Sequence, residues 1–301
     1  MIRIFTIKNE VIFNPETIAL FGLLDNLNCV SIEEHNYNLK GESRFHNLIE
    51  ACKTMFEYVD DITDCDICVM PYKYRGVNDP LFRYLFELCL HHDKVLYIFY
   101  NDDNDRPIAP DCKNIKIYRT SFYKSTKQDN EYALPAVDAD HFDGYIKDPK
   151  LSIGFCGAYH CNRMKYLQIL RDSDIETNFI LRSGFWAPEV SVKKNAKAEY
   201  MNNIRDNIFT FCYRGVGNFS YRFYDVMMMG RIPVFINTDC VLPFEDKYTD
   251  IGIIINEGDD IVQSIKDYYT KNKHRLHEIQ QNNRNIWEKF YSPIGFLANF
   301  I

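Results

Sequence analysis

The feature that most constrains the fold is an alternation of short, continuously apolar segments with segments of helical character. The apolar segments have strand length and occur at 2–7, 66–71, 94–100, 151–156, 177–182, 207–212, 232–236 and 251–256. The expected helices lie between or after them, at 43–59, 80–92, 162–172, 195–204, 219–229, 259–269 and 273–290. Continuously apolar strands are buried on both faces, which requires helices on both sides of a parallel sheet. The pattern therefore predicts an α/β fold.

The alternation breaks near the middle of the chain. Residues 101–112 are polar and contain prolines, and 119–150 carry polar tracts such as "STKQDNEY" and "KDPK", so we expect a linker there. The predicted domains are 1–145 and 146–290, with 291–301 as a tail that packs back on the first domain. We expect two Rossmann-like domains whose parallel sheets face each other across a cleft, with ligands bound beyond the carboxyl ends of the strands.

Charge and apolar patterning exclude several classes of protein. The formal net charge is -7, whereas a general nucleic-acid binder needs a basic face. No run reaches the roughly 18 apolar residues of a membrane span, and the start of the chain has no signal-peptide pattern, so we expect a cytoplasmic protein (host cytoplasm if it is viral). The ten cysteines are scattered through apolar segments, and the Cys65–Cys68 pair lacks a second pair at zinc spacing, which favours buried thiols.

The segment "FCYRGVGNFSYRFYDVMMMGRIPVFI" (211–236) reads as strand, glycine turn, helix and strand. Gly215 and Gly217 follow the strand directly, and glycine permits positive φ or close approach to a ligand. Asn218 or Ser220 is placed to cap the helix, whose free N–H groups form an anion site. Ser220 stands where a dinucleotide fingerprint needs its third glycine, which argues against a dinucleotide oxidoreductase.

The same segment carries charges that a packing unit does not need. Arg214 and Arg222 offer paired donors for phosphate oxygens, and Asp225, one turn into the helix, is placed to accept from ribose hydroxyls. The alternative is a glycine turn with surface arginines. The earlier segment "FCGAYHCNRMKYLQIL" (155–170) repeats the arrangement, with Arg163 in the first helical turn. A cation there opposes the helix dipole, so a bound anion would remove the conflict, although a solvated arginine is an open alternative.

The segment "RGVGNFSYRFYDVMMMGRIPVFINTDCVLPFED" (214–246) resembles the exostosin-type glycosyltransferases. The resemblance lies in the arginine–glycine turn, the S-x-R helix start with Asp225 behind it, the G-R-I-P-V segment (230–234) and the L-P-F-E-D segment (242–246). The "FCGAYHCNR" segment looks like the strand–turn–helix that enters the same domain, so the resemblance covers about 151–256. Animal members carry a membrane anchor, a stem and a second catalytic domain, so a soluble member of bacterial or large-virus type is the better fit.

The resemblance implies a GT-B fold in which the C-terminal domain binds a nucleotide sugar, usually a UDP-sugar, and transfers the sugar with inversion to a carbohydrate acceptor. By position, Arg163, Arg214, Ser220 and Arg222 would hold the diphosphate and Asp225 the ribose, while "LRSG" (181–184) would border the nucleobase. The expected donor-binding residues are Arg163, Arg182, Arg214, Gly215, Gly217, Asn218, Ser220, Tyr221, Arg222 and Asp225. No metal and no cofactor besides the donor are expected, because arginines and helix N-termini can stabilise the departing diphosphate.

Inverting transfer needs a base for the acceptor hydroxyl. The segment "DDND" (102–105) follows strand 94–100 at its carboxyl end, and we predict Asp103 first, then Asp102 or Asp105. Turn chemistry is the alternative for each. His35 also follows a strand and is another candidate base.

The segment "PYKYRGVND" (71–79) ends another N-terminal strand. Tyr72, Tyr74 and Arg75 are candidate acceptor contacts, and Asp79 is either a base or a helix cap.

Two functions of different classes remain open from the sequence. The first is a glycosyltransferase that moves a sugar, with xylose, galactose and glucuronate as candidates, from a UDP-sugar to a glycan acceptor. The second is a catalytically silent nucleotide-sugar or glycan-binding protein, which would keep the phosphate-binding arginines and lack the base.

Overall fold

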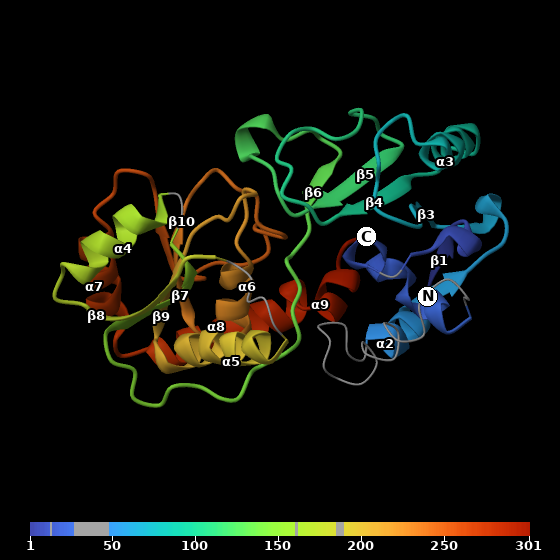
Figure 1. Ribbon diagram of the computed structural model, residues 1–301. Coiled ribbons are helices and arrows are strands. Elements are labelled where there is room, and N and C mark those ends of the chain that lie inside the picture. The colour runs from blue at the N-terminus through green and yellow to red at the C-terminus, as the bar shows by residue number, and fades with distance from the viewer. Residues whose placement is uncertain (13, 27–47, 160–161, 185–189) are drawn as a thin grey trace.

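Two parallel β-sheets form the framework of the molecule (Figure 1). The structure is a computed structural model that describes residues 1–12, 14–26, 48–159, 162–184 and 190–301. The N-terminal sheet has the strand order β2-β1-β3-β4-β5-β6 and the C-terminal sheet the order β11-β10-β9-β7-β8. Every strand pair within these two sheets is parallel. This arrangement confirms the predicted fold class.

The N-terminal sheet contains β1 (Ile2–Phe5), β2 (Phe56–Tyr58), β3 (Ile67–Val69), β4 (Leu96–Tyr100), β5 (Ile115–Arg119) and β6 (Glu131–Ala133). Alternate residues of β4 face opposite sides, as the two-residue period of a strand requires. Tyr97 and Phe99 enter a core covered by α2 (Leu48–Met55) and the 3₁₀ turns of Pro15–Asn26. Leu96 and Ile98 enter a second core covered by α3 (Pro80–His91).

The structure corrects the expected helix at 43–59. Within the described residues, helix α2 ends at Met55, and the next three residues form β2, which pairs with β1. The alternation in "FEY" explains this change, because Phe56 is buried and Glu57 is exposed.

The structure also corrects the expected linker at 119–150. Its first part belongs to the N-terminal sheet, since Arg119 ends β5 and Glu131 begins β6. These two polar side chains are fully buried at 0% and 1% exposure and form an ion pair of 2.5 Å. The connection without helix or strand therefore runs only from Leu134 to Leu151.

The C-terminal sheet contains β7 (Ser152–Ala158), β8 (Glu176–Arg182), β9 (Phe209–Cys212), β10 (Ile232–Ile236) and β11 (Ile253–Ile255). One core packs the sheet against α4 (Arg163–Arg171) and α7 (Ile261–Asn272). The other includes side chains of α5 (Val190–Asp206), of α6 (Tyr221–Met228) and of the end of α8 (Leu276–Ile286). Helices therefore cover both faces, as buried parallel strands require.

The chain returns to the N-terminal domain at its end. A π-helical turn (Trp287–Tyr291) leads into α9 (Pro293–Leu297), which lies against the N-terminal half in Figure 1. Phe296, Leu297 and Phe300 join the N-terminal core, where the Phe300 ring lies 5.6 Å from the ring of Phe99. The hydroxyl of Tyr118 donates a hydrogen bond to the Phe300 carbonyl oxygen. Phe296, Leu297 and Phe300 thus pack on the N-terminal domain, whereas Tyr291 belongs to the core of the C-terminal domain.

A second contact between the domains, here called the interdomain clasp, joins residues 121–125 to 237–240. Tyr123 and Cys240 form an isolated antiparallel bridge, and Lys124 N donates to Asp239 O at 2.7 Å. The Asp239 carboxylate accepts from Ser125 N at 3.0 Å and from Ser125 Oγ at 2.5 Å. The clasp brings the carboxyl ends of the strands of both sheets together.

None of the helices that the structure describes is long and apolar enough to cross a lipid bilayer. Cys65 and Cys68 are buried in the N-terminal core without a disulfide.

Candidate functional site

A pocket of about 870 Å³ lies at the carboxyl ends of the C-terminal strands. Its walls come from the ends of β7 and β8, the starts of α4 and α6, and helix α5, while Asp103, Val137 and Asp138 close it from the N-terminal domain and the connection. This is the edge at which ligands bind in open parallel sheets. Eight of the predicted site residues line the pocket: Asp103, Arg163, Arg182, Gly215, Ser220, Tyr221, Arg222 and Asp225.

Arg222, in the first turn of α6, has the geometry of an anion-binding side chain. It is 8% exposed, its guanidinium carbon lies 4.2 Å from the centre of the Phe155 ring, and its Nη2 donates to Cys156 O at 2.7 Å. Its Nε is buried and has no hydrogen-bond partner among the described residues. Together with Arg163 and Arg182, which line the same pocket, this positive charge favours a negatively charged ligand.

Gly157 makes room for that guanidinium. Its φ is +152°, and a Cβ at this position would lie 2.7 Å from Arg222 Nη2. The glycine of the "FCGAYHCNR" segment is thus explained by the approach of an arginine from another helix.

Arg163 and Arg182 line the pocket but already have protein partners. Arg163 is 5% exposed and donates to the carbonyl oxygens of Ala158, Tyr213 and Arg214 at 3.0, 3.3 and 2.8 Å. It is therefore not the solvated arginine of the alternative prediction, because it joins the ends of β7 and β9. Arg182 donates to Ala196 O at 3.1 Å and forms an ion pair with Glu199. Both contribute positive charge to the wall.

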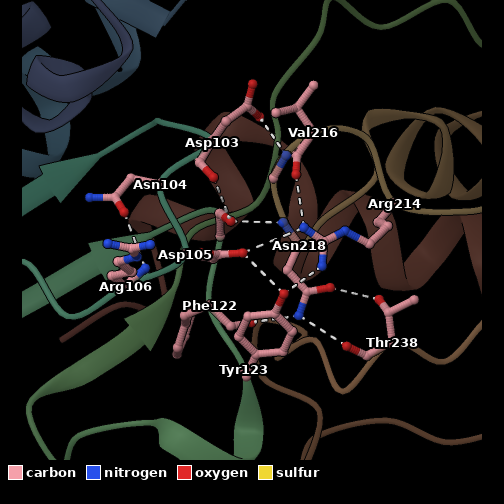
Figure 2. A network of polar contacts seen from close by, with 12 residues as sticks. Asp103, Asn104, Asp105, Arg106, Phe122, Tyr123, Arg214, Val216, Asn218 and Thr238 are labelled. Atoms are coloured by element: carbon pink, nitrogen blue, oxygen red, sulfur yellow. Dashed lines mark hydrogen bonds and ion pairs between the residues drawn. The ribbon is translucent and has the colours of Figure 1, made fainter. Parts of the chain in front are cut away.

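Arg214, Gly217 and Asn218 do not line the pocket, and their predicted role in donor binding stays a prediction. Figure 2 shows Tyr123 and Asp105 converging on the Arg214 guanidinium, at 2.6 Å from the Tyr123 hydroxyl and 3.5 Å from the carboxylate. These contacts direct the Arg214 guanidinium toward the N-terminal domain.

Asn218 and Gly217 also lie at the contact between the two domains. Asn218 is fully buried, and its amide donates to Phe122 O and Thr238 O at 3.0 and 3.1 Å (Figure 2). Neither Gly215 nor Gly217 takes a positive φ. A Cβ on Gly217 would lie 2.7 Å from Asp103 Oδ1, so the glycine allows close approach of the opposite domain instead of a ligand.

One of the three predicted aspartates reaches the pocket. Asp103 lines it, and its Oδ1 accepts from Gly217 N at 3.2 Å. Asp105 accepts a hydrogen bond from the Tyr123 hydroxyl at 3.0 Å and forms an ion pair with Arg214. It therefore stabilises the contact between the two domains. Neither Asp105 nor Asp102 lines the pocket, and their role as alternative bases stays a prediction.

Asp102 is held by an ion pair with Lys73 at 2.5 Å. Burial acts to raise the pKa of Asp102, but the Lys73 ammonium and the Asn104 N–H outweigh it and hold the pKa below its usual value.

Buried polar contacts fix the loop that carries Asp103. Arg119 Nη2 donates to Asn104 O at 2.6 Å, and Ser121 Oγ donates to Asp103 O at 3.2 Å. Ser121 Oγ also accepts from Asn218 N at 2.8 Å, so one hydroxyl joins the aspartate loop to the glycine turn of the other domain.

Asp225 also lines the pocket and is 4% exposed. The Tyr200 hydroxyl donates to its Oδ2 at 2.6 Å. Burial, and next the charge of Asp138, raise the pKa of Asp225 to about 7, while Lys197, Tyr200 and Arg222 act to lower it.

Sequence reasoning missed three residues of this wall: Asp138, Lys197 and Tyr200. Lys197 and Tyr200 are three positions apart on α5, which is a spacing that places both on one helical face. The expected helix at 195–204 was thus a usable signal for these two. Asp138 lies in the connection, where nothing in the local sequence marks it.

The remaining candidates are explained by the structure of the N-terminal domain. Asp79 is a helix cap, because its Oδ1 accepts from Leu81 N and Phe82 N at 2.9 and 3.1 Å. Tyr72 and Tyr74 are buried core residues at 7% and 5% exposure. His35 lies outside the described residues.

Comparison with known proteins agrees with the motifs. Residues 168–267, about a third of the chain, match the family described as Exostosin GT47 domain. This match confirms the predicted resemblance to exostosin-type glycosyltransferases and supports the assignment of the chain as a glycosyltransferase. The matched segment contains Arg182, Arg222 and Asp225. A search of curated protein sequences found no match.

Similar solved structures include Anabaena Alr3699/HepE with UDP and glucose, at 8% identity and a TM-score of 0.44, covering 99% of this chain and 98% of that one. T4 phage BGT with its UDP-glucose substrate has 13% identity, a TM-score of 0.38 and coverages of 99% and 97%. TarM has 13% identity and a TM-score of 0.41, covering 78% of this chain and 53% of TarM, so the chain spans about half of that protein.

Proposed function

We propose that the chain is an inverting glycosyltransferase that transfers a sugar from a UDP-sugar to a carbohydrate acceptor, with xylose, galactose and glucuronate as candidate sugars. The observation that carries the proposal is Arg222, a largely buried guanidinium in the wall of a pocket of about 870 Å³. The exostosin GT47 match includes this residue.

The diphosphate of the donor would lie at the start of α6. Ser220 is at the N-cap position, and its side chain makes no capping hydrogen bond, so the first N–H groups of the helix have no side-chain acceptor there. Free N–H groups and the helix dipole favour a phosphate at such an end. Arg222 adds a charged donor, and these groups would stabilise the negative charge that develops on the departing diphosphate.

Asp225 would accept the ribose hydroxyls, deeper in the pocket than the phosphates. Its carboxylate lies on the wall formed by α6 and α5 and is already oriented by the Tyr200 hydroxyl. The nucleobase would lie toward Arg182 and Gly184, at the end of β8, as the family resemblance implies.

Asp103 would act as the base, because it alone of the three candidate aspartates lines the pocket. Its carboxylate takes the proton from the acceptor hydroxyl as the acceptor oxygen attacks the anomeric carbon. The bond from that carbon to the diphosphate oxygen breaks, and the electron pair leaves with UDP. Attack opposite to the leaving group inverts the anomeric configuration.

The experiment is calorimetric titration with UDP, GDP and NAD, on the wild type, on Arg222→Met and on Arg171→Met. Arg171 is an exposed arginine at the end of α4 and serves as the matched control. We expect UDP alone to bind, and Arg222→Met to weaken it by about tenfold to a hundredfold, the loss of a charged hydrogen bond. Equal affinity in all three proteins would remove Arg222 from the site.

Catalysis is tested separately with a panel of UDP-sugars and simple glycan acceptors. Asp103→Asn should abolish transfer and leave UDP affinity close to wild type, whereas Asp105→Asn, on the same loop but outside the pocket, should retain transfer. UDP binding without transfer or hydrolysis for any sugar would favour the catalytically silent binding protein. Binding of NAD in place of UDP would favour the dinucleotide oxidoreductase that the sequence argued against.

A further inference from the structure

The wall that carries Asp225 is built from two parts of the chain that are far apart in sequence. Helix α5 supplies Lys197 and Tyr200, and the connection between the domains supplies Asp138, and all three line the same pocket as Asp225. The Lys197 ammonium forms an ion pair with the Asp138 carboxylate, so the pair fastens the connection to α5. A ligand in this part of the pocket would therefore touch the connection as well as the C-terminal domain.

We propose that Lys197 and Asp138 are positioning residues for the donor, which act through the Asp225 carboxylate and tie donor binding to the connection between the domains. The proposal rests on the proposed function, since it concerns the same nucleotide site. It assigns to Lys197 and Asp138 a role that neither the motifs nor the family match indicates.

The first step of the argument is the charge around Asp225. Tyr200 and Lys197 face it from α5, Asp138 from the connection and Arg222 from α6, and the Cys212 thiol lies near it from β9. Burial is the largest influence and raises the pKa of Asp225, and the Asp138 charge adds to it. Lys197 is the largest influence in the opposite direction. The members of the ion pair thus act on Asp225 with opposite sign.

One further titratable group lies beside the pair. His141 interacts with both Lys197 and Asp138, and its backbone N–H donates to the sulfur of Met228 at 3.4 Å. Burial, followed by the Lys197 charge, lowers the pKa of His141 below its usual value. His141 is therefore mostly neutral where Asp225 changes its charge.

The second step is the chemistry of ribose recognition. A ribose hydroxyl donates to a carboxylate, and an ionised acceptor makes a hydrogen bond roughly twice as strong as a neutral one. A protonated Asp225 is a neutral acceptor and makes the weaker bond. Since the pKa of Asp225 lies at about 7, donor affinity should rise with pH through the neutral range. The pH at which half of this rise has occurred then depends on the charges of Lys197 and Asp138.

The experiment measures UDP affinity by calorimetry from pH 5.5 to 8.5, a range set around the Asp225 pKa of about 7. Lys197→Met removes the positive charge and should move the midpoint to higher pH. Asp138→Asn removes the like charge and should move it to lower pH. We expect shifts of about half a pH unit or more in each direction, since one unit corresponds to about 1.36 kcal/mol.

Two controls separate the proposal from simple loss of structure. Asp225→Asn should flatten the part of the profile near pH 7, which places the dependence on that carboxylate. Lys165→Met, an exposed lysine on α4 outside the pocket, should leave the profile unchanged. The terminal phosphate of free UDP titrates near pH 6 whichever variant is measured, so differences between variants report the complex with the protein.

The outcomes distinguish this inference from the proposed function. Absence of UDP binding to the wild type at every pH contradicts the proposed function itself. UDP binding whose midpoint stays unchanged in both variants overturns the role of Lys197 and Asp138 while the nucleotide site stands. A shift in the same direction for both variants also overturns it, because a charge effect requires opposite signs.

Discussion

At the residue scale, the position of the Arg222 guanidinium depends on its contact with Gly157. Two segments far apart in sequence meet there, because the guanidinium lies over the Phe155 ring and donates to the carbonyl of Cys156. Any side chain at residue 157 would occupy the space of Nη2.

We therefore expect Gly157→Ala to displace Arg222 and to weaken UDP binding by about tenfold or more, the effect of one charged hydrogen bond. Gly76→Ala is the matched control, since Gly76 also has a positive φ, lies outside the pocket, and a Cβ there meets nothing within 4 Å. Calorimetry measures the affinities, and urea unfolding checks that both variants are folded. Wild-type affinity in Gly157→Ala would mean that Arg222 does not contact the nucleotide.

Site residues that lie on one local strand–turn–helix unit were easier to predict than the direction in which their side chains point. Ser220, Arg222 and Asp225 lie on one short strand–turn–helix unit, so local spacing places them at the strand end. Arg214 and Asn218 belong to the same unit, yet they face the other domain. Their direction depends on how the two domains dock, which is a long-range property that no local pattern contains.

At the scale of elements, the β5–β6 pair depends on a buried charge. Arg119 and Glu131 form an ion pair with almost no solvent exposure, and Arg119 also donates to the loop that carries Asp103. Removing one partner leaves the other charge buried and unpaired, which is more costly than removing both.

Arg119→Met should lower the free energy of unfolding by about 3–5 kcal/mol. The double variant Arg119→Met/Glu131→Met should recover much of this loss, because no charge is left buried. Urea unfolding measures both, with Lys116→Met, a partly exposed position on β5, as the control. Equal losses in the single and double variants would contradict the account.

The Arg119–Glu131 pair also explains why β6 was not predicted from the sequence. Strands made of apolar residues, such as β4 and β10, lie where the apolar runs predict them. The segment around β6 is polar, and it forms a strand because Glu131 finds a buried partner on β5. Such a partner is invisible in a local reading of "STKQDNEY", which therefore resembled a linker.

At the scale of the whole molecule, the pocket needs both domains, since Asp103 comes from one and Arg222 and Asp225 from the other. The interdomain clasp holds them together, and Asp239 is its central residue. Asp239 takes a φ of +61° and accepts two hydrogen bonds from Ser125. Aspartate and asparagine tolerate this backbone conformation better than alanine does.

Asp239→Ala should open the clasp, increase the radius of gyration measured by small-angle X-ray scattering, and weaken UDP binding. Asp239→Asn keeps a side-chain oxygen and the backbone preference, so it should remain close to wild type. Asp246→Ala, an exposed carboxylate in the same domain, provides a further control. An unchanged radius in Asp239→Ala would show that the other interdomain contacts suffice.

The return of the chain to its first domain affects how the protein is made. Domains usually fold in order as they leave the ribosome. Here Phe296, Leu297 and Phe300 belong to the N-terminal core, so this core stays incomplete until the second domain has emerged. The first domain to be synthesised is then the last to be finished, and part of its apolar core stays uncovered during translation. A nascent chain that stops just before α9 would contain every described residue of the pocket and still lack part of the core of its first domain.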